Sequence, residues 1–130
     1  MDFVKLNLTV LLLTHIMACL WITIGMASDG WVSTFVNLNK DKYEEEYKKE
    51  TDQTYEPESD QLFTDAMHRY CFPIYVNAAY FILTTITTVG YGDISGHTKY
   101  EYLFSMCVEF VGLTFFSLLT GTINVMFSGN

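Results

Sequence analysis

Long apolar stretches lie near both ends of the chain. Leu6 to Ser28 contains no Asp, Glu, Lys or Arg, and Tyr102 to Gly129 is interrupted only by Glu109. A bilayer core of about 30 Å needs roughly 20 helical residues, so each stretch can form one membrane-spanning helix. A signal peptide is the competing interpretation of the first stretch, but its apolar core would be shorter, and Lys5 alone is a poor positive flank. The pattern therefore predicts two spans.

A third apolar stretch, CFPIYVNAAYFILTTITTVG, leads into two closely spaced glycines. Pro73 favours a helix that begins at about Tyr75 and ends near Thr87, before Gly90 and Gly92. This helix would be about 20 Å long and too short to cross a bilayer. The chain must then enter the membrane and turn back. Non-helical backbone at that depth is tolerated where protein buries it or where it lines a water-filled or ion-filled path, so the geometry points to a pore.

The residues at this turn form a specific motif. TITTVGYGD, Thr85 to Asp93, resembles the selectivity-filter signature of potassium channels, Thr-x-x-Thr-Val-Gly-Tyr-Gly. The resemblance implies an all-α membrane protein with two transmembrane helices, a re-entrant pore helix and a selectivity filter, assembled with three further copies as a fourfold tetramer. It divides the chain into an outer pore helix (1–28), an acidic extracellular turret (29–72), the pore helix and filter (73–97) and an inner pore-lining helix (98–130).

The motif would supply oxygen atoms to a dehydrated cation. The backbone carbonyls of Thr88, Val89, Gly90 and Tyr91, with the Thr88 hydroxyl as the innermost ring, would replace the hydration shell of potassium. The side chains of Val89 and Tyr91 would pack behind the filter. Such a backbone must alternate between conformations that L-residues disfavour, and Gly90 and Gly92 permit positive φ. We expect potassium as the permeant ion, no cofactor and no enzymatic activity.

Four residues are expected to support the filter: Thr85, Gly92, Asp93 and Glu109. Asp93 would contribute to a ring of carboxylates that concentrates cations and would hydrogen-bond to the pore helix, with a solvated surface aspartate as the alternative. Glu109 is a costly carboxylate within a membrane helix. We expect it to support the back of the filter, through Thr84 or Tyr80, rather than to coordinate ions.

The second span has one face with polar positions. The candidate cavity-lining residues share this face at i, i+3, i+7 and i+11: Leu113, Phe116, Thr120 and Asn124. Gly112 lies where the family has a hinge glycine, and Gly121 is a second candidate hinge. Close packing of helices is the alternative for both glycines.

The first span carries a second resemblance. HIMACLWITIG is similar to the outer pore helix of channels with a cyclic-nucleotide-binding homology domain, which include the ether-à-go-go-like voltage-gated group; the specific residues are His15, Ala18, Cys19 and Trp21. The filter departs from that group, whose members often have Phe and Asn at the two variable places. Family members carry a voltage sensor before the pore and a cytoplasmic nucleotide-binding-like domain after it. The chain is therefore expected to be the pore module of a longer chain, with a complete miniature channel as the alternative.

Charge is concentrated between the apolar stretches. Nine acidic and four basic side chains lie in residues 40–60, in a chain of 130 residues with a net charge of −8. DKYEEEYKKE pairs Glu44 with Lys48 and Glu45 with Lys49 at i and i+4, which predicts a short exposed helix. The acidic connector would draw cations toward the pore mouth, with a merely solvated loop as the alternative. We expect no nucleic-acid partner.

Three functions are compatible with these features. A potassium-selective channel pore is favoured, and the alternatives are a weakly selective, nucleotide-modulated cation channel pore and a non-conducting membrane interaction protein with an acidic loop. We expect an integral, multi-pass protein surrounded by membrane lipid, in the plasma membrane or a ciliary-type cell membrane, with the acidic connector outside. The three cysteines define no disulfide framework, and Cys71 is expected to be a free thiol or an intersubunit contact.

Overall fold

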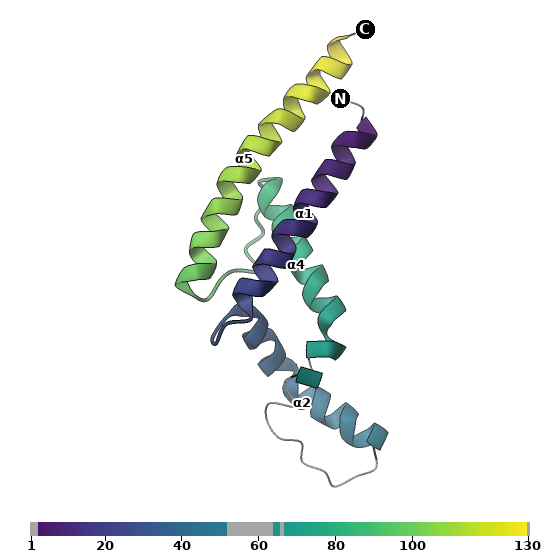
Figure 1. The fold of residues 1–130 in the computed structure, drawn as a ribbon, viewed down its shortest axis with the longest axis vertical. Coiled ribbons are helices and arrows are strands. Elements are labelled where there is room, and N and C mark those ends of the chain that lie inside the picture. Colours follow the sequence, from purple (N-terminus) through teal and green to yellow (C-terminus); the bar gives the residue numbers. More distant parts are fainter. Residues whose placement is uncertain (1–2, 52–63, 66, 130) are drawn as a thin grey trace.

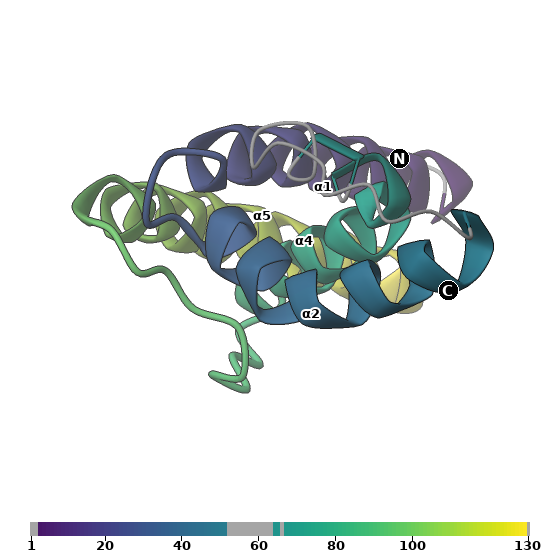
Figure 2. The ribbon, with the colours of Figure 1, turned by 90° about the horizontal axis from the view of Figure 1, so that it is seen from below.

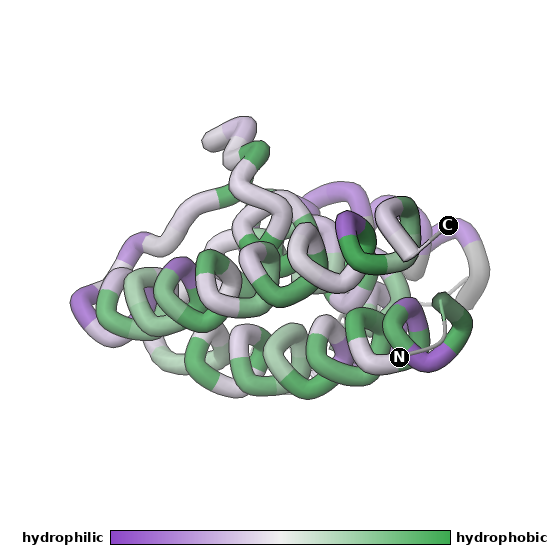
Figure 3. The backbone as a smooth tube through the Cα atoms, turned by 90° about the horizontal axis from the view of Figure 1, so that it is seen from above, coloured by the Kyte–Doolittle hydropathy of each residue, from purple (hydrophilic) through white to green (hydrophobic). Residues whose placement is uncertain are grey.

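The computed structural model describes residues 3–51, 64, 65 and 67–129, and the regular elements within them are helices. Their order is α1 (Phe3–Gly25), α2 (Trp31–Thr51), α4 (Cys71–Ile86) and α5 (Lys99–Ser128). α1 and α5 lie along one another with α4 packed against both, and α2 lies at the end of the bundle opposite the start of α1 and the end of α5 (Figure 1). α1 and α5 are long and apolar enough to cross a membrane, as the sequence predicts, and Figure 3 shows apolar residues along both.

α4 begins one turn earlier than expected. Its first residue is Cys71, whereas the sequence favoured a start at about Tyr75, so Pro73 lies inside the first turn. The first backbone N–H groups of a helix have no acceptor within the helix, and a proline there costs no hydrogen bond. α4 ends at Ile86, with Thr87 as its C-cap. At 16 residues the helix is shorter than a bilayer requires, which confirms the predicted short element.

Aromatic rings from the other three helices stack on Trp21 of α1. The fully buried Trp21 ring stacks on Trp31 of α2, Phe81 of α4 and Phe104 of α5, at centroid distances of 5.8, 4.5 and 5.9 Å. The Trp31 indole Nε1 also donates a hydrogen bond of 3.0 Å to the Trp21 carbonyl. Aromatic pairs of this kind contribute about 0.5–1.5 kcal/mol each beyond their burial. The cluster therefore holds the four helices together at one level.

α2 is longer than the short exposed helix predicted within residues 41–50. Its first two turns enter the core through Trp31, Val32 and Val36. In its second half Asp41, Lys42, Glu45, Lys48 and Lys49 are exposed, and the Glu45–Lys49 ion pair is confirmed with a distance of 2.8 Å. Glu44 pairs with Lys40 at 3.9 Å rather than with Lys48. The acidic residues of the connector between 52 and 63 lie outside the described residues.

α5 approaches α4 closely at Gly112. A Cβ atom at Gly112 would lie 2.8 Å from the Cα atom of Ile86, whereas a Cβ atom at Gly121 would meet nothing within 4 Å. Ile86 and the neighbouring Val108 of α5 are almost fully buried. The packing interpretation of Gly112 is therefore supported, and a hinge at either glycine stays a prediction.

Replacing Gly112 by alanine should destabilise the chain. The added methyl group would overlap backbone atoms of α4, and overpacking of this kind costs about 1–3 kcal/mol. Gly121→Ala on the same helix is the matched control, because its methyl group has space and alanine favours the helix. Thermal unfolding of both variants in detergent, followed by circular dichroism, measures the difference. Equal losses of stability would contradict the packing role of Gly112.

Candidate functional site

The segment that follows α4 has an alternating backbone. Thr88, Gly90 and Gly92 have positive φ angles of 62°, 53° and 77°, so every second residue lies in the left-handed region. The positive φ of both glycines confirms the prediction, whereas that of Thr88 was not predicted. A β-branched residue in this region is a genuine outlier that costs on the order of 1–3 kcal/mol and persists where its surroundings impose it.

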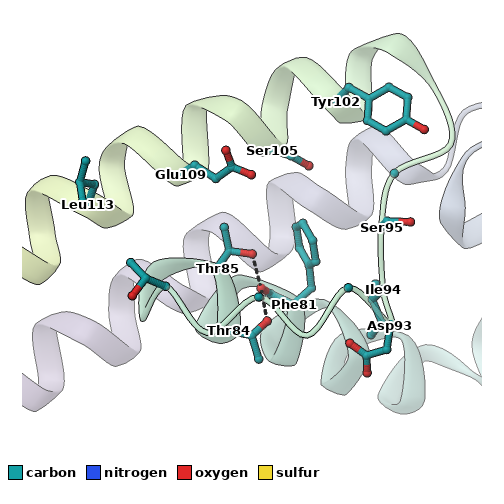
Figure 4. A pocket seen from close by; sticks show the side chains of 14 residues that line it. Phe81, Thr84, Thr85, Asp93, Ile94, Ser95, Tyr102, Ser105, Glu109 and Leu113 are labelled. Carbon is teal, nitrogen blue, oxygen red and sulfur yellow. Dashed lines mark hydrogen bonds between the residues drawn. The ribbon is translucent and has the colours of Figure 1, made fainter.

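Hydrogen bonds to the end of α4 impose this conformation. The backbone N–H groups of Val89 and Gly90 both donate to the carbonyl of Thr84, at 2.9 and 3.0 Å, and that of Thr88 donates to the carbonyl of Thr85 at 3.1 Å. These bonds satisfy the last carbonyls of a helix, which have no partner within it. The hydroxyls of Thr84 and Thr85 both donate to the Phe81 carbonyl, as Figure 4 shows. The threonine-rich end of α4 thus fixes the start of the segment.

The carbonyl oxygens of the segment accept no hydrogen bond from the described residues and are available to bind a cation. No described residue donates a hydrogen bond to the carbonyl of Thr88, Val89, Gly90 or Tyr91. All four residues are exposed, and Figure 2 shows the loop between α4 and α5 projecting on one side of the helices. Successive backbone carbonyls of this kind can coordinate a cation without adding net charge.

Side chains next to the carbonyls turn partly toward α4. The Tyr91 ring lies parallel to that of Tyr80, with centroids 6.3 Å apart, and Asp93 lines a cavity beside the segment. Val89 and Tyr91 remain 53% and 72% exposed in the single chain. Packing of these two side chains behind a filter therefore stays a prediction.

A cavity of about 570 Å³ separates the segment from α5 (Figure 4). Glu109 and Ser105 line it from α5, and Thr84 and Thr85 line it from α4. Glu109 is exposed and forms no hydrogen bond with another described residue, and the Thr84 hydroxyl donates to the Phe81 carbonyl instead. Glu109 thus faces the back of the segment, but the expected contact through Thr84 or Tyr80 is not formed within the single chain.

The predicted cavity-lining residues are exposed on α5: Leu113, Phe116, Thr120 and Asn124. Leu113 lines the cavity behind the segment, and the Thr120 hydroxyl donates to the Phe116 carbonyl at 2.9 Å. Their common face is therefore free in the single chain, and a role in lining an ion path stays a prediction.

The outer-helix motif joins α1 to α4. Ala18 and Trp21 are fully buried, and His15 Nδ1 lies 2.7 Å from the Tyr75 hydroxyl. Cys71 is a free, exposed thiol in the described chain, as are the other two cysteines.

Sequence reasoning missed Glu101, at the start of α5. Its carboxylate is fully buried and accepts hydrogen bonds from the backbone N–H groups of Trp31, His97 and Thr98, at 2.6, 2.6 and 2.9 Å. The available signal was Thr98-x-x-Glu101 before an apolar run, the pattern of a capping box. That pattern predicts the bond to Thr98 but not the bond to α2.

Gly90→Ala should loosen the hydrogen bonds that hold the segment. An L-residue at a φ of 53° is strained even though its Cβ atom has space, so the backbone should leave this conformation and release the bond to Thr84. We expect amide hydrogen exchange at residues 89 and 90 to accelerate by about tenfold, for a cost of about 1.4 kcal/mol. Gly121→Ala is the control. Unchanged exchange in Gly90→Ala would show that the segment does not depend on positive φ there.

The chain is similar in sequence to known ion channels. A family model described as an ion channel matches residues 62–128. The potassium voltage-gated channel protein eag of Drosophila melanogaster is 24% identical over 122 residues, which cover 89% of this chain and 10% of eag. The human voltage-gated inwardly rectifying potassium channel KCNH6 is 28% identical over 126 residues, which cover 91% of this chain and 11% of KCNH6. The chain thus spans about a tenth of the length of these relatives, and no solved structure matches it.

Proposed function

Since the chain belongs to the ion channel family, we propose that it forms a potassium-selective pore through which dehydrated potassium moves along backbone carbonyls. The observation that carries this proposal is the alternation of positive φ at residues 88, 90 and 92, next to four successive carbonyls without a donor among the described residues. The Drosophila and human relatives, both named as potassium channels, support the choice of ion.

In this proposal, the carbonyls of Thr88, Val89, Gly90 and Tyr91 and the Thr88 hydroxyl replace the water around potassium. One chain supplies one wall of such a cage, so the pore requires three further copies around a fourfold axis. α4 is then the re-entrant pore helix, and the negative end of its dipole at Ile86 favours a cation. Asp93 concentrates cations at the mouth, and Glu109 supports the back of the filter.

The same proposal sets the orientation in the membrane. The protein is a membrane protein, and α1 and α5 are its two spans in a plasma-type cell membrane, with α2 on the outer side. Large apolar side chains such as Leu8, Leu12, Phe110 and Leu118 are exposed on these helices, which suits contact with lipid or with neighbouring copies. The relatives are about ten times longer than this chain. The proposal therefore includes a longer chain that carries voltage-sensing and nucleotide-binding-like domains in addition to the pore.

Flux measurements in liposomes test the pore. We expect the tetrameric protein to pass potassium down its gradient and to pass little sodium, because the carbonyl cage replaces the hydration shell of potassium. Gly90→Ala in the same liposomes should lose most of the flux. Absence of both fluxes from a protein shown to be tetrameric would refute the pore. Equal potassium and sodium fluxes would refute selectivity and favour a weakly selective cation pore.

Thr88 variants test the innermost oxygen ring. Thr88→Ala removes one hydroxyl per subunit and should weaken block by barium about tenfold, which corresponds to about 1.4 kcal/mol. Thr88→Ser is the matched control, because it keeps the hydroxyl and should keep block near the level of the unmodified chain. Barium block that is the same in all three proteins would contradict the role of the hydroxyl.

A further inference from the structure

Glu101 connects two parts of the chain that lie far apart in sequence. Its Oε1 atom accepts a hydrogen bond from the backbone N–H of Trp31, 70 residues away, and its Oε2 atom accepts from His97 and Thr98. A carboxylate buried without partners would be very costly. Three charge-assisted bonds to backbone N–H groups offset that cost and make the contact short and directional.

The carboxylate lies between the N-termini of two helices. Trp31 is the first residue of α2, and Thr98 is the N-cap of α5. Helix N-termini carry N–H groups without partners and the positive end of the helix dipole, so each favours a negative charge. One side chain therefore stabilises the start of both helices, and it does so only while α2 and α5 keep their relative positions.

The segment that leaves the candidate filter passes close to Glu101. A Cβ atom at Gly96 would lie 2.8 Å from the Cβ atom of Glu101, and His97 is itself one of the donors. A second cavity, of about 220 Å³, is lined by Trp31 and Phe35 of α2 on one side and by Asp93 and Ile94 on the other. The first turns of α2 thus face the residues that follow the filter.

We propose that Glu101 is a positioning residue of the pore mouth, which couples the placement of α2 to that of residues 93–97 and so to conduction. This proposal rests on the potassium channel function proposed above. It assigns to α2 a role beyond that of a charged surface, because Trp31 binds one oxygen of the carboxylate whose other oxygen accepts from His97 and Thr98, so that displacement of Trp31 shifts the acceptor of the segment that follows the filter.

Two substitutions detach α2 while sparing the start of α5. In Glu101→Gln, an amide oxygen at the Oε2 position keeps the bonds to His97 and Thr98, and the NH₂ group leaves the Trp31 N–H unpaired. Glu101→Asp keeps the charge and can still cap α5, but it is one methylene too short to reach both partners; it serves if Glu101→Gln yields no folded protein. Glu45→Gln, at an exposed position of α2, is the control.

Amide hydrogen exchange and potassium flux are measured on the full chain of each variant. We expect exchange at Trp31 to accelerate about tenfold or more, because a buried N–H loses its acceptor. Exchange at residues 94–97 should also rise, and flux should fall about fivefold or more, as expected for a coupling of ordinary size. Glu45→Gln should match the unmodified chain in all three measurements.

The outcomes separate this proposal from the proposed function. Faster exchange at Trp31 alone, with residues 94–97 and the flux unchanged, would overturn the coupling and leave Glu101 as a local cap. Unchanged exchange at Trp31 would overturn the contact itself. If the unmodified chain conducts no ion, the channel function fails, and exchange at residues 94–97 still decides whether Glu101 couples α2 to that segment.

Discussion

Stacking of aromatic rings around Trp21 is the interaction on which the described arrangement depends. α4 is too short to span a membrane, so its position is set by what it packs against rather than by its own length. Phe81 forms the closest stack with Trp21, and its carbonyl accepts the hydroxyls of Thr84 and Thr85. The Thr84 carbonyl in turn holds the first amides of the filter segment. A contact within the core thus determines where the carbonyls of that segment begin.

Those parts of the fold that depend on local sequence could be predicted. Uncharged length indicated α1 and α5, and the glycine spacing indicated positive φ at Gly90 and Gly92. The start of α4 could not be predicted, because Pro73 is compatible with any place in the first turn. The buried start of α2 was also missed, since Trp31 is held by partners in α1 and α5 that lie far away in sequence.

The candidate site could be predicted where its residues are adjacent in the sequence. Thr88 to Asp93 form one motif, whereas the left-handed conformation of Thr88 opposes its own preference and results from bonds to the end of α4. The capping pattern of Glu101 is visible in the sequence, but its bond to Trp31 exists only in the folded chain. Glu109 differs again, because it finds no hydrogen-bond partner within the described part of one chain.

Burial along α5 is confined to its first half. The buried residues are Glu101, Val108 and Gly112, although the helix continues to Ser128. The remaining length is about 24 Å at about 1.5 Å per residue, so a tilt of about 10° at Gly112 would displace the end of the helix by about 4 Å. The half of α5 next to the filter segment is held by packing, whereas the other half is free in the single chain. A small rotation at Gly112 would therefore move the C-terminal end of the helix by several times more than it moves the residues near the filter segment.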